Sequence, residues 1–560
     1  MKKGRLALML LASSLLCVPA CNSGSSSGGG QQTVITISQT EASIVKGQTL
    51  QLTVTGATGN LEWSSSKTDV ATVSGSGLVT AVAEGSAVIT VKVAGTDNKA
   101  TCRVTVVGDY FIKEPTEILI KTTFNDTYGQ IWQDAAAELM KKEPNLTINY
   151  EKYGGSYNQL KDEIVSGVPA GNYPDITVAY PDSVADFITA GVQYDIDELI
   201  DDPDAGWTEA EQADYFAEYL DEGRHYSVEG TYSLPIAKST EAMYYDGDKI
   251  LGLKLPGVNG GNAITESYIN SLTWDELFNV FCPALLTYRE TLDADKKKAF
   301  LDTETYSDWA LVGYDSDDNL FITLAEQYGY GYTSMDPVTG EGHIDFNNSE
   351  MKELMKKFNA AYKNKYFTTK GIIGTNVNYR SNADAMLFSI GSTGGVNYQF
   401  SSTNPKNVKV ARIPQAPNKD TKLIMQGPSF TILDHSDDNR TLASWLFYKQ
   451  LTTQTRCVAW STTTGYSPIR VSVGQSDDYL DYMDDTAYEE KTVDKLKAFN
   501  AQYSLNMTRY LFSSPVFKGS SEARVQVGGL ATKAISDANL TDETLKTLFD
   551  QAYENTILKM

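Results

Sequence analysis

The sequence predicts a small all-β sandwich followed by a larger α/β domain. Two observations predict this fold class: apolar residues alternate with polar ones in the first module, and strand-like and helix-like stretches take turns after Pro115. A chain of 560 residues is long enough for more than one domain. Its hydrophobic fraction of 41% allows each domain to bury a core.

The first module, residues 33–107, consists of short alternating segments. They are TVITIS (33–38), TLQLTV (49–54), AVITVKV (87–93) and CRVTVV (102–107). Turn signals separate them at regular intervals, which favours a sandwich. LEWSSS (61–66) with DVATV (69–73), and GLVTA (77–81) with EGSAVI (84–89), resemble the group 2 bacterial Ig-like domain. The resemblance implies that Trp63 is a core residue. We expect a spacer, with adhesion as the alternative.

The second module repeats a strand–helix–strand order from residue 117 to residue 190. Strands are expected at 117–123, 146–150 and 174–180, and helices at 130–142, 157–165 and 183–190. Such units build a parallel sheet whose ligands bind at the carboxyl ends of the strands. Residues 122–125 and 180–182 follow two of those ends, so their position makes them candidate ligand contacts.

The N-terminus has the order of a targeting segment. A basic stretch (1–5) precedes an apolar stretch (6–18), then Cys21 and a Gly/Ser run. This order resembles a bacterial lipoprotein, which implies a signal peptide at 1–20, lipid attachment at Cys21 and a flexible tether at 21–32. The protein is then anchored to the membrane at the cell surface or in the periplasm. A plain secretory signal is the alternative.

Composition excludes several classes of function. The formal charge of −24 repels nucleic acid, so we expect no nucleic-acid partner. Three histidines argue against a His-built zinc site or a Ser-His-Asp hydrolase. Cys102, Cys282 and Cys457 show no metal spacing and are expected to be buried. We expect no cofactor.

One acidic stretch begins like an EF-hand loop. Asp315, Asp317 and Asn319 have the right spacing, and Glu326 falls at the twelfth place. Leu320, however, occupies the sixth place, where the sharp turn needs glycine. No metal site is therefore expected.

Residues 233–250, SLPIAKSTEAMYYDGDKI, are expected to carry the chain from one globular half to another. Ser239 and Thr240 offer hydroxyls beside this crossing. Only one of Tyr244 and Tyr245 can face a cleft there if the segment is extended, because neighbouring side chains point in opposite directions. An ordinary buried strand with a turn is the alternative.

The order of motifs after Pro115 resembles the family 1 extracellular solute-binding proteins of ABC importers. The matching motifs are GNYPDI (171–176), residues 233–250, TWDEL (273–277), GYDS (313–316) with NLF (319–321), AML (385–387), IGSTGG (390–395), QGPS (426–429) and TGYSPIR (464–470). The resemblance implies a two-lobed periplasmic-binding-protein-like fold (type II) over residues 115–560. Lobe one takes about 115–238 and 426–471, and lobe two about 243–425 and 473–560.

The resemblance also implies which residues hold the ligand between the lobes. Within the family, the fit is closest to the glycerol-3-phosphate receptors, which implies Tyr157, Asp182, Ser239 or Thr240, Ser392, Gly427, Tyr466 and Arg524. Backbone N–H groups around Thr393 can face a ligand oxygen, and Tyr180, Trp460 and Tyr466 can stack on a sugar ring. Arg524 can clamp a phosphate or donate to vicinal hydroxyls, and a surface salt bridge is its alternative role. Trp274, Trp309 and Trp445 fit helical cores.

These features favour a lipid-anchored, monomeric, non-enzymatic receptor. It is expected to deliver a carbohydrate or a polyol phosphate to an ABC permease. Two alternatives remain: a secreted polysaccharide-degrading enzyme, because carboxylates are plentiful, and an adhesin built on the Ig-like module. The sequence does not distinguish a neutral sugar from a phosphorylated polyol.

Overall fold

The computed structural model describes residues 34–108 and 110–560, so Cys21 and the predicted signal and tether lie outside the described residues. The chain divides into two compact units, Met1–Asp109 and Tyr110–Met560. Each unit has its own hydrophobic core. Within the described ranges, no helix combines the length and apolar character needed to cross a bilayer.

The first unit is all β, as the alternation predicts. Its strands are β1 (Thr36–Ile37), β2 (Glu41–Val45), β3 (Thr49–Gln51), β4 (Val54–Thr55), β5 (Leu61–Ser65), β6 (Ala71–Val73), β7 (Leu78–Ala81), β8 (Gly85–Val93) and β9 (Lys99–Val107). They form sheets in the orders β2-β9-β8-β5, β3-β7-β6 and β1-β4. Trp63 is partly buried against the core. Gly77 has a positive φ of 82°, and a Cβ there would lie 2.7 Å from the Trp63 ring.

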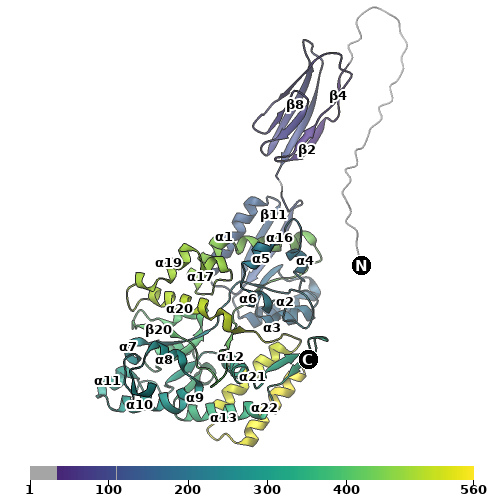
Figure 1. Ribbon diagram of the computed structural model, residues 1–560. Helices are drawn as coiled ribbons and strands as arrows, with labels where there is room; N and C mark the ends of the chain where they lie inside the picture. The colour runs from purple at the N-terminus through teal and green to yellow at the C-terminus, as the bar shows by residue number, and fades with distance from the viewer. Residues whose placement is uncertain (1–33, 109) are drawn as a thin grey trace, which may run out of the picture. The chain divides into compact units, whose positions relative to one another are not determined.

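The second unit contains two mixed five-stranded sheets, which define the two lobes (Figure 1). The first has the order β11-β10-β12-β22-β13 and the second the order β18-β15-β19-β14-β20. The first sheet uses β10 (Thr116–Thr122), β11 (Leu146–Lys152), β12 (Ile176–Ala179), β13 (Leu234–Pro235) and β22 (Ser429–Ile432). The second uses β14 (Glu241–Asp246), β15 (Val312–Tyr314), β18 (Phe367–Thr369), β19 (Phe388–Ser392) and β20 (Val408–Ala411).

The predicted strand–helix order of the first lobe is present, and β10 pairs in parallel with both β11 and β12. The lobe's helices are α1 (Asp126–Lys142), α2 (Tyr157–Gly167), α3 (Pro181–Thr189), α4 (Asp197–Ile200), α5 (Glu209–Ala213), α6 (Ala217–Glu222), α16 (Asp438–Leu451) and α17 (Gln454–Thr464), followed by α18 (Val471–Gly474) and α19 (Asp477–Met483). Helix α1 begins four residues before the expected residue 130, because the Asn125 side chain accepts the Tyr128 N–H and caps it. Trp132 and Trp445 are fully buried in the core of this lobe.

The second lobe packs helices on its sheet and gathers the C-terminal part of the chain. Its helices are α7 (Gly247–Ile250), α8 (Glu266–Ser271), α9 (Trp274–Glu276), α10 (Cys282–Glu290), α11 (Ala294–Phe300), α12 (Asp317–Tyr328), α13 (Ser349–Lys363), α14 (Lys370–Ile373), α15 (Val377–Asn382), α20 (Val493–Met507), α21 (Ser520–Ser536) and α22 (Asp542–Ile557). Figure 1 shows α21 and α22, in yellow, beside α12 and α13. Trp274 is fully buried, whereas Trp309 is only partly buried.

Two short sheets complete this unit, β16 (Thr333–Met335) with β17 (Gly342–Ile344) and β21 (Leu423–Ile424) with β23 (Leu511–Phe512). Between β13 and β14 the chain passes from the first sheet to the second, where residues 233–250 were expected to cross. It returns between β20 and β22, and α19 then leads to α20. Tyr244 and Tyr245 on β14 are each 1% exposed, so neither faces a cleft.

Candidate functional site

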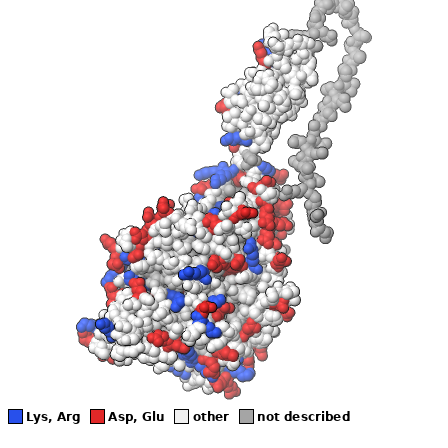
Figure 2. Space-filling view, viewed as in Figure 1, with Lys and Arg blue, Asp and Glu red and all other residues white. Residues whose placement is uncertain are grey.

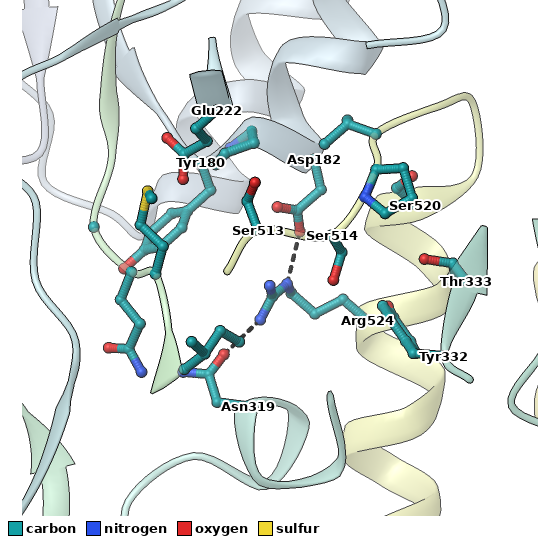
Figure 3. A pocket seen from close by; sticks show the side chains of 17 residues that line it. Tyr180, Asp182, Glu222, Asn319, Tyr332, Thr333, Ser513, Ser514, Ser520 and Arg524 are labelled. Carbon is teal, nitrogen blue, oxygen red and sulfur yellow. Dashed lines mark hydrogen bonds and ion pairs between the residues drawn. The ribbon is translucent and has the colours of Figure 1, made fainter. Parts of the chain in front are cut away.

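A small polar cavity lies where α3, α12 and α21 meet (Figure 3). Tyr180 and Asp182 line it from the first lobe, and Asn319 and Arg524 from the second. Its free volume is about 40 Å³, little more than one water molecule needs. Cavities that hold small ligands are about 300–1,000 Å³. In this structure the two lobes therefore leave too little space between them at this point for such a ligand.

Arg524 joins the two lobes across this cavity. Its Nε donates to Asp182 on α3 at 2.9 Å, while Nη1 donates to Asp318 at 3.0 Å and to Asn319 at 2.6 Å on α12. Figure 3 shows the side chain reaching from α21 towards the first lobe. The sequence predicted a surface salt bridge as the alternative to a phosphate clamp, and in the structure the guanidinium pairs with two carboxylates.

The charged groups at this junction stabilise one another's charged forms. Burial opposes the charge on Arg524, but Asp182 and Asp318 outweigh it, so the pKa of the guanidinium lies above its ordinary value. Burial alone would raise the pKa of Asp318, yet Arg524 and the Ser316 hydroxyl hold that pKa below its usual range. Two carboxylates facing one guanidinium leave this part of the cavity with a net negative charge.

Tyrosines predicted as ligand contacts gather on the first lobe. The Tyr157 ring meets Tyr180 edge to face at 5.3 Å between centroids, and Trp460 stacks on Tyr466 at 5.9 Å and 6°. Burial, with Tyr157 and Tyr180 close by, raises the pKa of Tyr466. Tyr180 lines the cavity itself, whereas Trp460 is 4% exposed and lies behind Tyr466. These rings offer apolar faces with hydroxyl tips, which suits sugar rings.

The hydroxyls predicted at the chain crossing contact one another. Ser392 Oγ donates to Ser239 Oγ at 3.0 Å, and the Thr240 N–H donates to Thr393 Oγ1 at 3.1 Å. Thr240 Oγ1 also donates to the Ile424 carbonyl. None of these four residues lines the cavity. Ser239 instead pairs by its backbone with Gln426, which does line it, so the hydroxyl cluster backs the cavity wall.

Two glycines among the predicted motifs allow close approach. Gly427 lines the cavity with a φ of +91°, and a Cβ there would lie 1.7 Å from the Ala237 carbonyl oxygen. A Cβ on Gly394 would lie 2.6 Å from the Tyr466 ring. The glycine-rich turn of the second lobe thus packs directly on the tyrosine of the TGYSP turn in the first.

Sequence reasoning missed a buried ion pair beside the cavity. Lys238, which is 0% exposed, pairs with Glu222 at the end of α6 and donates to Ser429 Oγ at 2.7 Å. Ser429 Oγ donates in turn to Glu222. Glu222 also lines the cavity. Only the long-range fold brings these residues together, so no local pattern could have indicated the pair.

Asn500 and Glu241 were missed as well. Asn500 Oδ1 accepts the Tyr244 hydroxyl at 2.8 Å, and its Nδ2 donates to the Thr393 carbonyl in the second lobe and the Gly465 carbonyl in the first. Glu241 is fully buried, and one of its oxygens accepts from the Tyr314 hydroxyl. Burial raises the pKa of Glu241 to about 8. Both residues tie the crossing strand β14 to its surroundings.

In the EF-hand-like stretch, the Asp317 carboxylate is engaged in hydrogen bonds within the protein. The Asp317 carboxylate accepts from the Gly371 N–H and from the hydroxyls of Thr369 and Thr532. It thereby fastens the start of α12 to α14 and α21. Cys102, Cys282 and Cys457 are buried free thiols, as expected.

The second unit thus consists of two α/β lobes with a small cavity between them. Two family models match the sequence: the bacterial extracellular solute-binding protein over residues 134–489, and the group 2 bacterial Ig-like domain over residues 32–104. The chain belongs to the bacterial extracellular solute-binding proteins and carries an N-terminal Ig-like domain. The predicted receptor class is confirmed, because this family consists of solute-binding receptors rather than enzymes.

Solved structures share the fold at low sequence identity. UgpB from Mycobacterium tuberculosis, in complex with glycerophosphocholine, matches with a TM-score of 0.58 and 13% identity, over 79% of this chain and 98% of its own. The GacH receptor of Streptomyces glaucescens and the sugar-binding protein MalE from Xanthomonas citri each match with a TM-score of 0.56, 13% identity and the same shares of both chains. No curated protein matches the sequence.

Proposed function

We propose that the protein captures an uncharged carbohydrate between its lobes and delivers it to an ABC permease. One observation carries this choice over a polyol phosphate: Arg524, the only cationic residue among the described residues that line the cavity, already pairs with Asp182 and Asp318. A phosphate dianion would meet a net negative surface, whereas sugar hydroxyls can donate to the carboxylates and the sugar ring can stack on Tyr180. Two proteins that share the fold bind such ligands: MalE is a sugar-binding protein, and GacH has been solved in complex with acarbose.

A glycerophosphodiester with a cationic head is a second candidate. Asp182 and Glu222 line the cavity beside Tyr180, and carboxylates with an aromatic face suit a quaternary ammonium group. UgpB, described with glycerophosphocholine, has the same fold. This candidate differs from the first in needing the negative charge of the lining.

Isothermal titration calorimetry with maltotetraose, glycerophosphocholine and glycerol 3-phosphate tests the proposal. We expect maltotetraose to bind and glycerol 3-phosphate not to. Preference for glycerophosphocholine would favour the second candidate, and binding of glycerol 3-phosphate above both others would contradict the charge argument. Asp182→Asn is the matched variant: removing its charge should weaken a cationic ligand more than a neutral one.

We also propose that a lipid on Cys21 holds the receptor at the membrane, with the Ig-like domain as a spacer. The sequence order of basic, apolar and Gly/Ser segments around Cys21 supports the anchor. Cys21→Ser should move the protein from the membrane fraction to the soluble fraction. Equal membrane association of both forms would contradict it.

A further inference from the structure

A second groove lies on the second lobe between α8, β20 and α20. Its volume is about 680 Å³, and it shares no lining residue with the cavity between the lobes. Three cationic side chains line it: Lys409, Arg412 and Lys495. Figure 2 shows acidic side chains spread over the visible face of the second unit. The groove combines its three cations with three carboxylates, those of Glu266, Asp485 and Glu490.

Arg412 differs from the two lysines because no carboxylate neutralises it. Lys409 lies 3.8 Å from Glu266, and Lys495 lies 3.2 Å from both Asp485 and Glu490. Among the residues that the structure describes, Arg412 has no ion pair. Its Nη1 donates to Thr421 Oγ1 at 2.5 Å, and its Nε is buried without an acceptor.

Burying the Arg412 Nε–H without an acceptor costs free energy. A buried polar group with no partner loses its hydration without compensation, and a charged one loses more. Burial accordingly lowers the pKa of Arg412, and only the nearby tyrosines Tyr503 and Tyr510 oppose that shift. Other arginines of this unit, such as Arg380, Arg440 and Arg470, each pair with an aspartate.

Aromatic side chains form the rest of the wall. The Lys409 and Lys495 ammonium groups lie 4.2 and 5.5 Å from the centre of the Phe499 ring. Tyr503 and Tyr510 also line the groove, and both are close enough to Arg412 to affect its charge. The groove therefore offers a fork of guanidinium donors, two further cations and flat faces within one open volume.

We propose that this groove is a binding site for a small organic anion, a carboxylate or a phosphate monoester carried on a polar ring. Arg412 takes the anionic group with its unpaired donors, and Phe499, Tyr503 and Tyr510 contact the ring. Glu266, Asp485 and Glu490 also line the groove and pair with Lys409 and Lys495, so the formal charges of the lining balance. The unpaired guanidinium of Arg412, rather than an excess of positive charge, is therefore what selects an anion. The site stands whether or not the cleft takes a carbohydrate.

Calorimetry on the full mature chain tests the site with three probes that share a ring: glucuronate, glucose 6-phosphate and uncharged glucose. We expect at least one anion to bind at millimolar concentration or below, and Arg412→Gln to weaken it at least tenfold. Lys409→Gln should weaken it several-fold and serves if Arg412→Gln fails to fold. Arg509→Gln is the matched control, because Arg509 stacks on Tyr510 at 5.0 Å without lining the groove, and it should leave affinity unchanged.

Four outcomes would overturn the proposal. The first is no binding of either anion, and the second is binding unchanged in both Arg412→Gln and Lys409→Gln. The third is anion binding lost in Arg524→Met but kept in Arg412→Gln, which would place the anion in the cleft. The fourth is an affinity for uncharged glucose equal to that for the two anions, which would show that the guanidinium does not select charge.

Discussion

Two cation–carboxylate groups lie at the cavity, and they differ in burial and in which parts of the chain they join. Lys238 and Glu222 both belong to the first lobe, and their side chains are 0% and 3% exposed. Arg524 pairs across the lobes with Asp182 and within its own lobe with Asp318, and 26% of its side chain is exposed. The first group is sealed by the fold, whereas the second depends on lobe closure.

The difference teaches which charges belong to the fold and which to the binding event. A sealed pair must remain intact whenever the lobe is folded, because either partner alone would be an uncompensated buried charge. A pair that spans the lobes can separate when they open, and water can then hydrate both partners. Stability measurements should therefore report on Lys238 and affinity measurements on Arg524.

Removing Lys238 should have the largest effect on stability. Lys238→Met leaves Glu222 buried with only Ser429 as a partner, which should cost about 3–5 kcal/mol in the free energy of unfolding. Urea unfolding followed by circular dichroism measures it. The matched control is Lys121→Met, whose partly exposed bridge to Glu163 at 2.8 Å should cost less than about 1 kcal/mol. Equal costs would remove the distinction between sealed and exposed pairs.

Removing Arg524 should mainly affect binding. Arg524→Met deletes the link to Asp182, so closure should weaken by about 1.5–3 kcal/mol, which is roughly 10- to 150-fold in affinity for the cleft ligand. Calorimetry measures the affinity, and small-angle scattering should show a more open protein. The unfolding free energy should fall less than in Lys238→Met. A larger fall would mean that this pair, too, belongs to the fold.

The sequence predicted the fold class and the order of elements because both depend on local patterns. Alternation marked the strands of the first unit, and strand–helix repeats marked β10 to α3. Four predicted site residues, Tyr180, Asp182, Gly427 and Arg524, line the cavity, and their role in binding stays a prediction.

Partners distant in sequence could not be predicted. Glu222 and Ser429 are 207 residues apart, and Asn500 and Tyr244 are 256 apart. Asn500 lies in a helix whose sequence gives no sign that its amide will be buried against two lobes. The sequence also did not show that Ser239 and Ser392 would bond to each other, since that needs the register of β14 on β19.

The raised pKa of the buried Glu241 carboxyl predicts that the free energy of unfolding depends on pH. Burial raises that pKa to about 8, above the ordinary value of a glutamate. The folded protein then binds a proton that the unfolded chain has released, so stability falls as pH rises between the two values, by about 1.4 kcal/mol per pH unit. Melting temperatures between pH 5 and pH 8 should fall less in Glu241→Gln than in the wild type. Parallel pH profiles would contradict the raised pKa.

The smallest effect is expected at Ser239, where the hydroxyl cluster is satisfied without a ligand. Ser239→Ala removes the acceptor of the Ser392 hydroxyl, but Ser392 Oγ still accepts the Gly394 N–H. The free energy of unfolding should fall by about 1 kcal/mol. Affinity for the cleft ligand should stay within a factor of a few, because Ser239 does not line the cavity. Tyr180→Ala is the contrasting variant, since Tyr180 lines the cavity. A loss of affinity in Ser239→Ala as large as in Tyr180→Ala would show that the cluster opens to the ligand when the lobes separate.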